Sequence, residues 1–355
     1  MIMAGGTGGH VFPALSLAKV LRDRDCEIVW LGTRTGIEAR LVPASGFPIE
    51  WIAIGGLRGK GLATLASAPL RLLRALAQSI RAIRRHNPSV VVGLGGYVTG
   101  PGGLAAWLTR RPLVIHEQNA IAGLTNRVLA RLATVVLEAF EGSFPLSCRA
   151  RAIGNPVRDE FFAGVSPETR YASRSGPIRM LVVGGSQGAA RLNAVVPEAL
   201  AALRGRVSVY VRHQSGERGL ETARARYTAL GVEAEVVPFI NDIAAEYAEA
   251  DLVICRAGAL TVSEIAAIGV AAIFVPFPAA VDDHQTRNAQ ALVERGAAVL
   301  MPESTLGASA LAKTIERLAG DRQALADMAR RAREIARPQA THELAAATLA
   351  AGGLA

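Results

Sequence analysis

The chain has 355 residues, half of them hydrophobic, and a formal net charge of +9. This length suits two domains of ordinary size, and the composition is that of a folded protein. The positive charge favours anionic partners, but interleaved aromatic residues and Cys/His fingers are missing, so we expect no nucleic acid. Three widely spaced cysteines argue against a disulfide framework, and no apolar run is long enough to span a bilayer. We therefore expect a cytosolic protein, which can still lie on a membrane surface.

Short apolar runs alternate with amphipathic segments along the chain. The strand-like runs are 27–32, 90–96, 112–118, 134–140, 179–186, 207–214, 234–239, 251–258 and 271–277. Continuous apolar strands separated by helical segments predict parallel sheets that are covered on both faces. Each half also begins with a strand, a glycine-rich turn and a helix start, in "MIMAGGTGGH" and "RMLVVGGSQGAARLN". We predict an α/β protein with two doubly wound domains in tandem.

A polar stretch after "AIGNPVRDEF" separates the two halves, and we place the boundary near Pro156. The predicted domains are 1–156 and 157–337, and an Ala-rich helix at 338–355 is expected to pack back on the first of them. Ligands of open α/β sheets bind beyond the carboxyl ends of the strands. Two such domains facing each other would therefore hold a ligand in the cleft between them.

The two glycine-rich turns, "GGTGGH" and "GGSQG", are candidates for binding phosphate or a polyol. Glycine lets the backbone approach a ligand closely, and the N-terminus of the following helix attracts anions. The alternative is that both are merely tight turns. The dinucleotide fingerprint requires a third glycine, where this chain has Val11, and an acidic residue at the end of the second strand, where it has Gly32. Hydride transfer is therefore disfavoured.

Two other polar patterns each have two interpretations. Thr261 and Glu264 have the spacing of a helix capping box, but Glu264 could instead accept hydrogen bonds from a ribose diol. The pattern alone does not choose between them. The run Asp282-Asp283-His284 resembles a metal cluster, but such a run is more often a solvated loop.

The segment "APLRLLRALAQSIRAIRRHNP" (68–88) predicts an amphipathic helix. One stripe carries Arg71, Arg74, Gln78, Arg81 and Arg85, and a wide apolar face carries Leu72, Leu73, Leu76, Ile80 and Ile83. The simpler interpretation is a domain helix with its apolar side on the sheet. The alternative is contact with anionic lipid, for which the candidates are Arg71, Arg74, Ile80, Arg81 and Arg85, joined by Trp107 and Arg110-Arg111.

A series of motifs runs through the whole chain in a fixed order. They are "MAGGTGGHVFPAL", "GLRGKG", "GLGGYVTGPGGLAA", "HEQNAIAGLTN", "GNPVR", "VVGGSQGA", "CRAGALTVSEIAA" and "DDHQTRNA". On these motifs the chain resembles the MurG family of bacterial transferases, in glycosyltransferase family 28. The resemblance implies the GT-B fold, in which two Rossmann-like domains face each other across a cleft. It implies a hexosyltransferase that moves GlcNAc from UDP-GlcNAc to lipid I, giving lipid II for peptidoglycan synthesis.

The resemblance also implies roles for individual residues. Donor binding falls on Thr7, Gly8, Gly9, Asn119, Arg158, Ser186, Ile240, Ala259, Leu260, Thr261, Val262, Ser263, Glu264 and Gln285. Glu264 would hold the ribose, and the backbone around Ile240 the uracil. Tyr97 and Thr99 would line the acceptor side. His10 is the candidate general base, with an ordinary pKa of about 6.5.

Transfer from an α-linked donor to a β-1,4 product inverts the anomeric carbon, so we expect a single in-line displacement. Helix N-termini, loop N–H groups and Arg158 are expected to stabilise the leaving UDP, with no metal or cofactor. The expected partners are UDP-GlcNAc, lipid I, an anionic membrane surface, and proteins of cell-wall synthesis and division. The expected location is the cytoplasmic face of the inner membrane, as a peripheral protein. The alternatives are a UDP-GlcNAc 2-epimerase and a non-catalytic sugar-nucleotide-binding scaffold.

Overall fold

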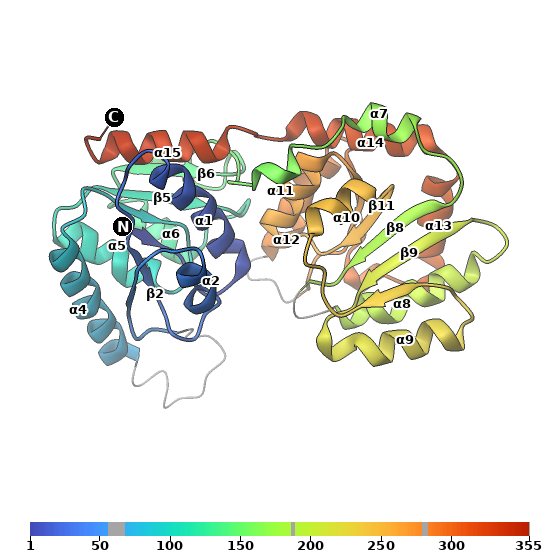
Figure 1. Ribbon diagram of the computed structural model, residues 1–355, viewed down its shortest axis with the longest axis horizontal. Helices are drawn as coiled ribbons and strands as arrows, with labels where there is room; N and C mark the ends of the chain where they lie inside the picture. The colour runs from blue at the N-terminus through green and yellow to red at the C-terminus, as the bar shows by residue number, and fades with distance from the viewer. Residues whose placement is uncertain (56–67, 186–188, 279–282, 355) are drawn as a thin grey trace. The chain divides into compact units, whose positions relative to one another are not determined.

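The computed structural model describes residues 1–55, 68–185, 189–278 and 283–354. The chain divides into two compact units (Figure 1). Unit 1 comprises Met1–Arg158 and Arg337–Ala355, and unit 2 comprises Asp159–Ala336. The chain thus leaves unit 1 once, builds unit 2, and returns to unit 1 for its last helix.

Unit 1 is built on a parallel sheet of seven strands in the order β3-β2-β1-β4-β5-β6-β7. The strands are β1 (Ile2–Met3), β2 (Trp30–Gly32), β3 (Ile49–Trp51), β4 (Val91–Gly93), β5 (Leu113–Glu117), β6 (Val135–Glu138) and β7 (Arg151–Ala152). Central strands are buried on both faces, as their continuous apolar runs predict. Alternate side chains point to opposite faces, so Ile2 enters one core cluster and Met3 the other.

Helices cover both faces of this sheet. They are α1 (Gly8–Arg22), α2 (Glu38–Ala44), α4 (Ala68–His86), α5 (Thr99–Leu108), α6 (Leu124–Leu129) and α15 (Ala340–Ala351). One face is packed by α1 and α15, through side chains such as Leu17 and Leu344. The other is packed by α4, α5 and α6, through Ile83, Ala105 and Leu129. The last helix of the chain therefore completes the core of unit 1 (Figure 1).

Unit 2 repeats the architecture with six parallel strands in the order β10-β9-β8-β11-β12-β13. The strands are β8 (Ile178–Val183), β9 (Val209–Gln214), β10 (Glu235–Val237), β11 (Leu252–Cys255), β12 (Ala271–Phe274) and β13 (Ala298–Leu300). The helices are α7 (Pro167–Ala172), α8 (Ala190–Ala202), α9 (Leu220–Ala229), α10 (Ile243–Glu249), α11 (Ala259–Ile268), α12 (His284–Val293), α13 (Ala308–Ala319) and α14 (Arg322–Ile335). Short 3-10 turns lie at Leu146–Cys148, Asp159–Phe161, Glu217–Gly219 and Glu303–Thr305.

Helix α4 forms where the sequence predicts it, but only part of its predicted apolar face is buried. Its buried side chains are Ala75, Ser79, Ala82 and Ile83, and Leu76 and Ile80 pack at the edge of the same core. Leu72 and Leu73, expected on the buried face, are 42% and 63% exposed. The first turns of α4 therefore present leucines to solvent beside the exposed arginines. Over the described part of the chain, no helix is both long enough and apolar enough to cross a bilayer.

The turns that follow the neighbouring strands β1 and β4 touch through their backbones. Gly96 has φ +85°, and a Cβ added there would lie 2.2 Å from the carbonyl oxygen of Gly5. Gly95 has φ +97°, and a Cβ there would lie 2.5 Å from Cδ2 of His10. Both positions require glycine because the conformation and the space exclude a side chain.

The close approach at Gly96 predicts a large loss of stability in Gly96→Ala. The strained φ and the clash with Gly5 should together lower the free energy of unfolding by roughly 2–5 kcal/mol. All three tryptophans of the chain, Trp30, Trp51 and Trp107, lie in unit 1, so denaturant unfolding followed by tryptophan fluorescence reports this unit.

Gly100→Ala is the matched control, because Gly100 lies in α5 and a Cβ added there would meet Thr125 Cγ2 at an ordinary 3.5 Å. Alanine there should leave the stability unchanged or raise it by up to about 1 kcal/mol. Equal effects of the two substitutions would contradict the close packing of the two turns.

Candidate active site

The first candidate turn leads from β1 into α1. Thr7 is the N-cap of α1, but its side chain makes no capping hydrogen bond, and the first turn holds no acidic residue. Thr7 and Gly9 are exposed. The first turn of α1 therefore supplies no side-chain cap and no acidic residue of its own at the positive end of the helix. The Thr7 hydroxyl lies 3.4 Å from Nδ1 of His10, a long contact that orients the imidazole within the first turn.

The turn after β4 forms the opposite wall of this site. The ring of His10 packs against Gly95, so the two glycine-rich turns bring the imidazole to the carboxyl edge of β1 and β4. Tyr97 in this turn is 58% exposed. Thr99 is fully buried and its hydroxyl donates to the carbonyl of Gly95 at 2.9 Å. Of the two predicted acceptor-side residues, Tyr97 is therefore exposed at the surface, whereas the buried Thr99 stabilises the turn from inside the protein.

A buried carboxylate organises the loop after β5. Glu117 is 3% exposed and accepts hydrogen bonds from the Asn119 amide at 2.9 Å and the Gly123 amide at 3.1 Å. The side chain of Asn126 also donates to it, at 2.9 Å. The clamp holds Asn119, a predicted donor-binding residue, at the same sheet edge as His10. Sequence reasoning did not assign Glu117 a role; its one signal was its position at the end of a buried strand.

Arg158 also lies beside α1. Its guanidinium carbon is 5.5 Å from the centroid of the Phe12 ring, which is a cation–π contact. Phe12 follows His10 by two residues, so the contact brings a positive charge near the start of α1. Unit 1 therefore gathers His10, Thr7, Asn119 and Arg158 around one edge of its sheet.

The first turn of α11 is the main candidate in unit 2. The helix begins at Ala259 after Gly258, so Thr261 and Glu264 lie inside it. The capping-box interpretation is therefore wrong, because Gly258 already provides the extended N-cap residue. The turn has no side-chain cap and no acidic residue, which leaves its backbone N–H groups suited to an anion.

The side chains of this predicted donor run differ in their surroundings. Val262 is completely buried and Ala259 is 8% exposed, so these two pack into the core. Leu260, Thr261, Ser263 and Glu264 are half-buried. The Ser263 hydroxyl donates to the carbonyl of Ala259 at 2.9 Å. The half-buried residues are those whose side chains can reach a ligand.

Gln285 connects two loops at the carboxyl edge of unit 2. Its Oε1 accepts from the amides of Ala257 at 3.3 Å and Phe277 at 2.9 Å, which follow β11 and β12. Asn288, fully buried and not singled out from the sequence, donates to the carbonyl of Ala257 at 3.2 Å. These bonds orient the Gln285 side chain within its loop.

The structure describes some, but not all, of the remaining residues predicted from the sequence. Ile240 follows β10 and is 6% exposed. Ser186 and the motif at 56–61 lie outside the described residues. Asp283 accepts a hydrogen bond from the Thr286 hydroxyl at 2.7 Å. Among the described residues, no group of three His, Cys, Asp or Glu side chains could hold a metal ion.

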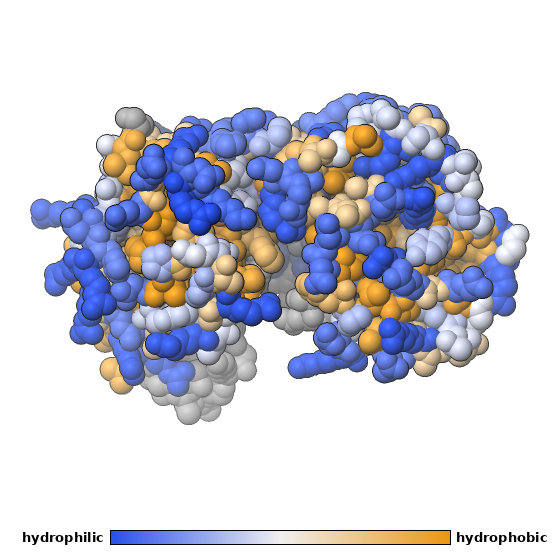
Figure 2. Space-filling view, viewed as in Figure 1, coloured by the Kyte–Doolittle hydropathy of each residue, from blue (hydrophilic) through white to orange (hydrophobic). Residues whose placement is uncertain are grey.

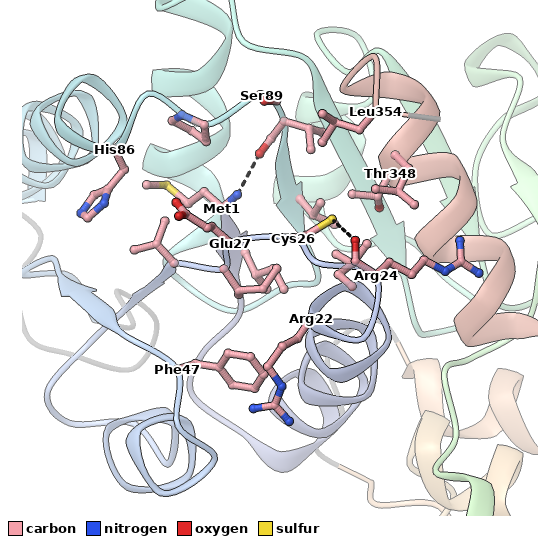
Figure 3. A pocket seen from close by; sticks show the side chains of 18 of the residues that line it. Met1, Arg22, Arg24, Cys26, Glu27, Phe47, His86, Ser89, Thr348 and Leu354 are labelled. Carbon is pink, nitrogen blue, oxygen red and sulfur yellow. Dashed lines mark hydrogen bonds between the residues drawn. The ribbon is translucent and has the colours of Figure 1, made fainter.

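One pocket of unit 1 lies away from these turns (Figure 3). Its volume is about 840 Å³, and its lining includes Cys26, Phe47, His86 and Val90. The Met1 amino group donates to the carbonyl of Val90 at 2.8 Å at its edge. These residues lie before the strands, at the amino edge of the sheet. Because open α/β sheets bind ligands at the opposite edge, the glycine-rich turns, rather than this pocket, are the candidate active site.

A buried network in unit 2 supports the loop after β9. His213 Nδ1 lies 2.9 Å from the Tyr227 hydroxyl, and its Nε2 lies 3.0 Å from Asn193 Oδ1. Asn193 in turn donates to the carbonyl of Ser215 at 3.0 Å. Burial lowers the pKa of His213 to about 4 and raises the pKa of Tyr227. His213 is therefore a neutral, structural histidine at pH 7.

Comparison with known proteins shows which family the chain belongs to. Residues 1–138 match the N-terminal domain model of glycosyltransferase family 28, and residues 179–344 match its C-terminal domain model. The chain is 57% identical over 354 residues to the UDP-N-acetylglucosamine--N-acetylmuramyl-(pentapeptide) pyrophosphoryl-undecaprenol N-acetylglucosamine transferase of Ralstonia nicotianae, covering 99% of this chain and 96% of that protein. It is 56% identical to the protein of the same name from Nitrosococcus oceani, covering 97% and 96%. The crystal structure of Acinetobacter baumannii MurG matches with a TM-score of 0.86 and 43% identity, over 99% of each chain.

The two doubly wound parallel sheets, together with these matches, define a glycosyltransferase of the GT-B class. The chain belongs to glycosyltransferase family 28. The fold class predicted from the alternating strands and helices is therefore confirmed.

The lowered pKa of His213 predicts a loss of stability in mild acid. The unfolded chain takes up a proton near pH 6.5, whereas folded His213 does so only near pH 4. Its contribution to stability is complete above pH 6.5 and is lost progressively as the pH falls toward 4. In NMR spectra of the folded protein, the His213 ring signals should stay those of a neutral imidazole from pH 7.5 to 5. A midpoint near pH 6.5 would contradict the burial of this network.

Proposed function

We propose that this protein transfers GlcNAc from UDP-GlcNAc to the 4-hydroxyl of MurNAc in undecaprenyl-diphospho-MurNAc-pentapeptide, giving lipid II. The observation that carries the proposal is the placement of His10 at the carboxyl edge of unit 1, between the Thr7 hydroxyl and Gly95. Full-length identity of 56–57% to transferases named for this reaction supports the choice of substrates.

The donor is assigned chiefly to unit 2. The uncapped first turn of α11 suits the diphosphate, because its N–H groups and helix dipole stabilise negative charge. Half-buried Glu264, in the second turn of the same helix, is assigned the ribose diol. Ile240, in the loop that follows β10, offers backbone groups to uracil. The proposed donor set is completed by Gln285, Ser186, Thr7, Gly8, Gly9 and Asn119.

His10 is assigned the role of general base on the acceptor. In an inverting displacement, O4 of MurNAc forms a bond to C1 of GlcNAc as the bond from C1 to the diphosphate oxygen breaks. The proton of the 4-hydroxyl passes to the imidazole of His10. The negative charge leaves with UDP, and the Arg158 guanidinium beside α1 and the helix N-termini stabilise that charge.

We further propose that unit 1 binds the cytoplasmic surface of the membrane through helices α4 and α5. Arg71, Arg74, Arg81 and Arg85 are exposed on α4, and Leu70 and Leu73 are 73% and 63% exposed. Trp107 and Leu108, at the end of the neighbouring α5, are 50% and 49% exposed. Figure 2 shows hydrophilic side chains along the left side of the view, where α4 lies in Figure 1. Exposed apolar side chains among cations are what an anionic lipid surface attracts.

Not every candidate on α4 is equally available. Arg85 forms an ion pair with Glu50 at 3.2 Å, a residue that His86 also contacts at 2.7 Å. Ile80 packs at the edge of the core and supports the helix from inside. Arg71 and Arg74, in the leucine-exposing first turns, are therefore expected to contribute more than Arg85.

The transfer assay tests the reaction and the base together. With labelled UDP-GlcNAc and a lipid I analogue, the wild-type protein should form a lipid-linked disaccharide. His10→Ala should lower kcat by about 10²–10⁴-fold, the usual contribution of a positioned base. His342→Ala, which removes an exposed histidine on α15, is the control and should leave kcat unchanged.

Three results would each contradict a different part of the proposal. Conversion of UDP-GlcNAc without transfer by the wild type would favour an epimerase, and absence of any turnover would favour a binding scaffold. Full activity in His10→Ala would keep the reaction but remove His10 as the base.

Liposome binding tests the membrane surface. Replacing Arg71, Arg74, Arg81 and Arg85 with Gln should weaken binding to anionic vesicles by at least tenfold, because each arginine near such a surface contributes up to about 1 kcal/mol. The control carries the same change in charge on unit 2, at Arg218, Arg295, Arg317 and Arg331. Equal losses in the two variants would show that net charge, rather than this surface, governs binding.

A further inference from the structure

A second buried carboxylate, Glu38, lies beneath the His10 turn. It is the first residue of α2 and is completely buried. One carboxylate oxygen accepts a hydrogen bond from the Gly6 amide at 2.9 Å. The other accepts from the Thr33 amide at 3.0 Å and from the Thr33 hydroxyl at 2.7 Å. A single side chain therefore ties together the turn after β1 and the turn after β2.

Glycines on two sides leave room for the Glu38 carboxylate. A Cβ on Gly5 would lie 2.6 Å from Glu38 Oε1, and a Cβ on Gly36 would lie 2.0 Å from Oε2. Gly6 itself has φ +90°, a conformation that glycine adopts without strain. Glycines on two sides thus allow the carboxylate to reach the backbone of the His10 turn.

The Glu38 contact fixes the turn from the side opposite to β4. Gly6 is followed directly by Thr7, the N-cap of α1, whose hydroxyl contacts His10. On the other side, Gly96 packs against the Gly5 backbone and Gly95 against the His10 ring. The peptide that leads into His10 is therefore held between a carboxylate and a second glycine turn.

We propose that Glu38 is a positioning residue for His10, which fixes the imidazole for proton transfer without touching the substrate. The inference rests on the function proposed above, because it concerns the base of that reaction. All three hydrogens that Glu38 accepts come from N–H and O–H donors, so both carboxylate oxygens must act as acceptors.

This pattern of donors makes Glu38→Gln an informative substitution. Glutamine has nearly the same shape, but one end of its amide carries two hydrogens. The NH2 group must face either the Gly6 amide or the Thr33 amide. Two N–H donors then oppose each other, and one hydrogen bond is lost. The Gly6 turn then shifts, and a displacement of about 1 Å at a catalytic group can cost on the order of 100-fold in rate.

The decisive experiment is a double-mutant cycle measured as kcat with UDP-GlcNAc and a lipid I analogue. Glu38→Gln alone should lower kcat by about 10- to 100-fold. In the His10→Ala background, Glu38→Gln should have no further effect, because a residue that acts through His10 cannot matter once His10 is absent. A purely structural role would instead multiply the two losses.

Asp251→Asn is the control for loss of a buried carboxylate. Asp251 is 1% exposed and accepts from the Arg179 amide at 2.9 Å and from Arg174 at 2.7 Å, at the amino end of β11. Asp251→Asn should destabilise unit 2 and leave kcat within twofold. Thr33→Val, which removes one donor but keeps Glu38, serves if Glu38→Gln does not fold; it should lower kcat severalfold with the same dependence on His10.

An NMR readout separates this inference from the proposed reaction. In Glu38→Gln, the Gly6 amide proton should exchange faster and the His10 ring signals should shift, whether or not the wild type transfers GlcNAc. Unchanged His10 signals, retained kcat in Glu38→Gln, or fully multiplicative losses in the cycle would each overturn the role of Glu38. Absence of transfer by the wild type, with shifted His10 signals, would overturn the reaction and leave the positioning contact standing.

Discussion

The active edge of unit 1 depends on a close contact between two backbones. Strands β1 and β4 are neighbours, and the turns that follow them approach so closely that a Cβ on Gly96 would lie 2.2 Å from the Gly5 carbonyl. This contact leaves no room for side chains between the two turns, and the His10 ring packs against Gly95. The glycines lose more entropy on folding than other residues would. In the proposed function, these glycines give backbone groups and the His10 imidazole access to a ligand at the end of the sheet.

The same edge is stiffened by buried carboxylates that bind amides rather than cations. Glu38 accepts from the turns after β1 and β2, and Glu117 accepts from the loop after β5. A carboxylate that accepts several N–H groups is a strong, directional clamp. Unit 2 uses neutral groups for the same purpose, since Gln285 and Asn288 hold the loop after β11 and the His213 network holds the loop after β9. Both units thus hold turns at the carboxyl edges of their sheets with buried polar side chains, and the N-caps of α1 and α11 make no side-chain hydrogen bond.

Much of this fold could be predicted from the sequence, because buried parallel strands are continuous apolar runs. The strands that escaped prediction, β3, β7 and β13, have two or three residues and are only partly buried or exposed, so they carry little pattern. The spacing of Thr261 and Glu264 suggested a cap, but the helix had already begun at Ala259 after Gly258. Glu38 and Glu117 were not assigned roles because their partners lie in loops that only the folded sheet brings near. The Gly6 amide that Glu38 binds is 32 residues away along the chain.

The central claim is that this edge supports a single inverting displacement onto a sugar hydroxyl. The most direct measurement is the configuration of the new bond, read from the anomeric proton coupling of the disaccharide that the wild-type protein makes from UDP-GlcNAc and a lipid I analogue. The account predicts a β-1,4-linked GlcNAc. An α-linked product, or free sugar released in place of a disaccharide, would contradict it.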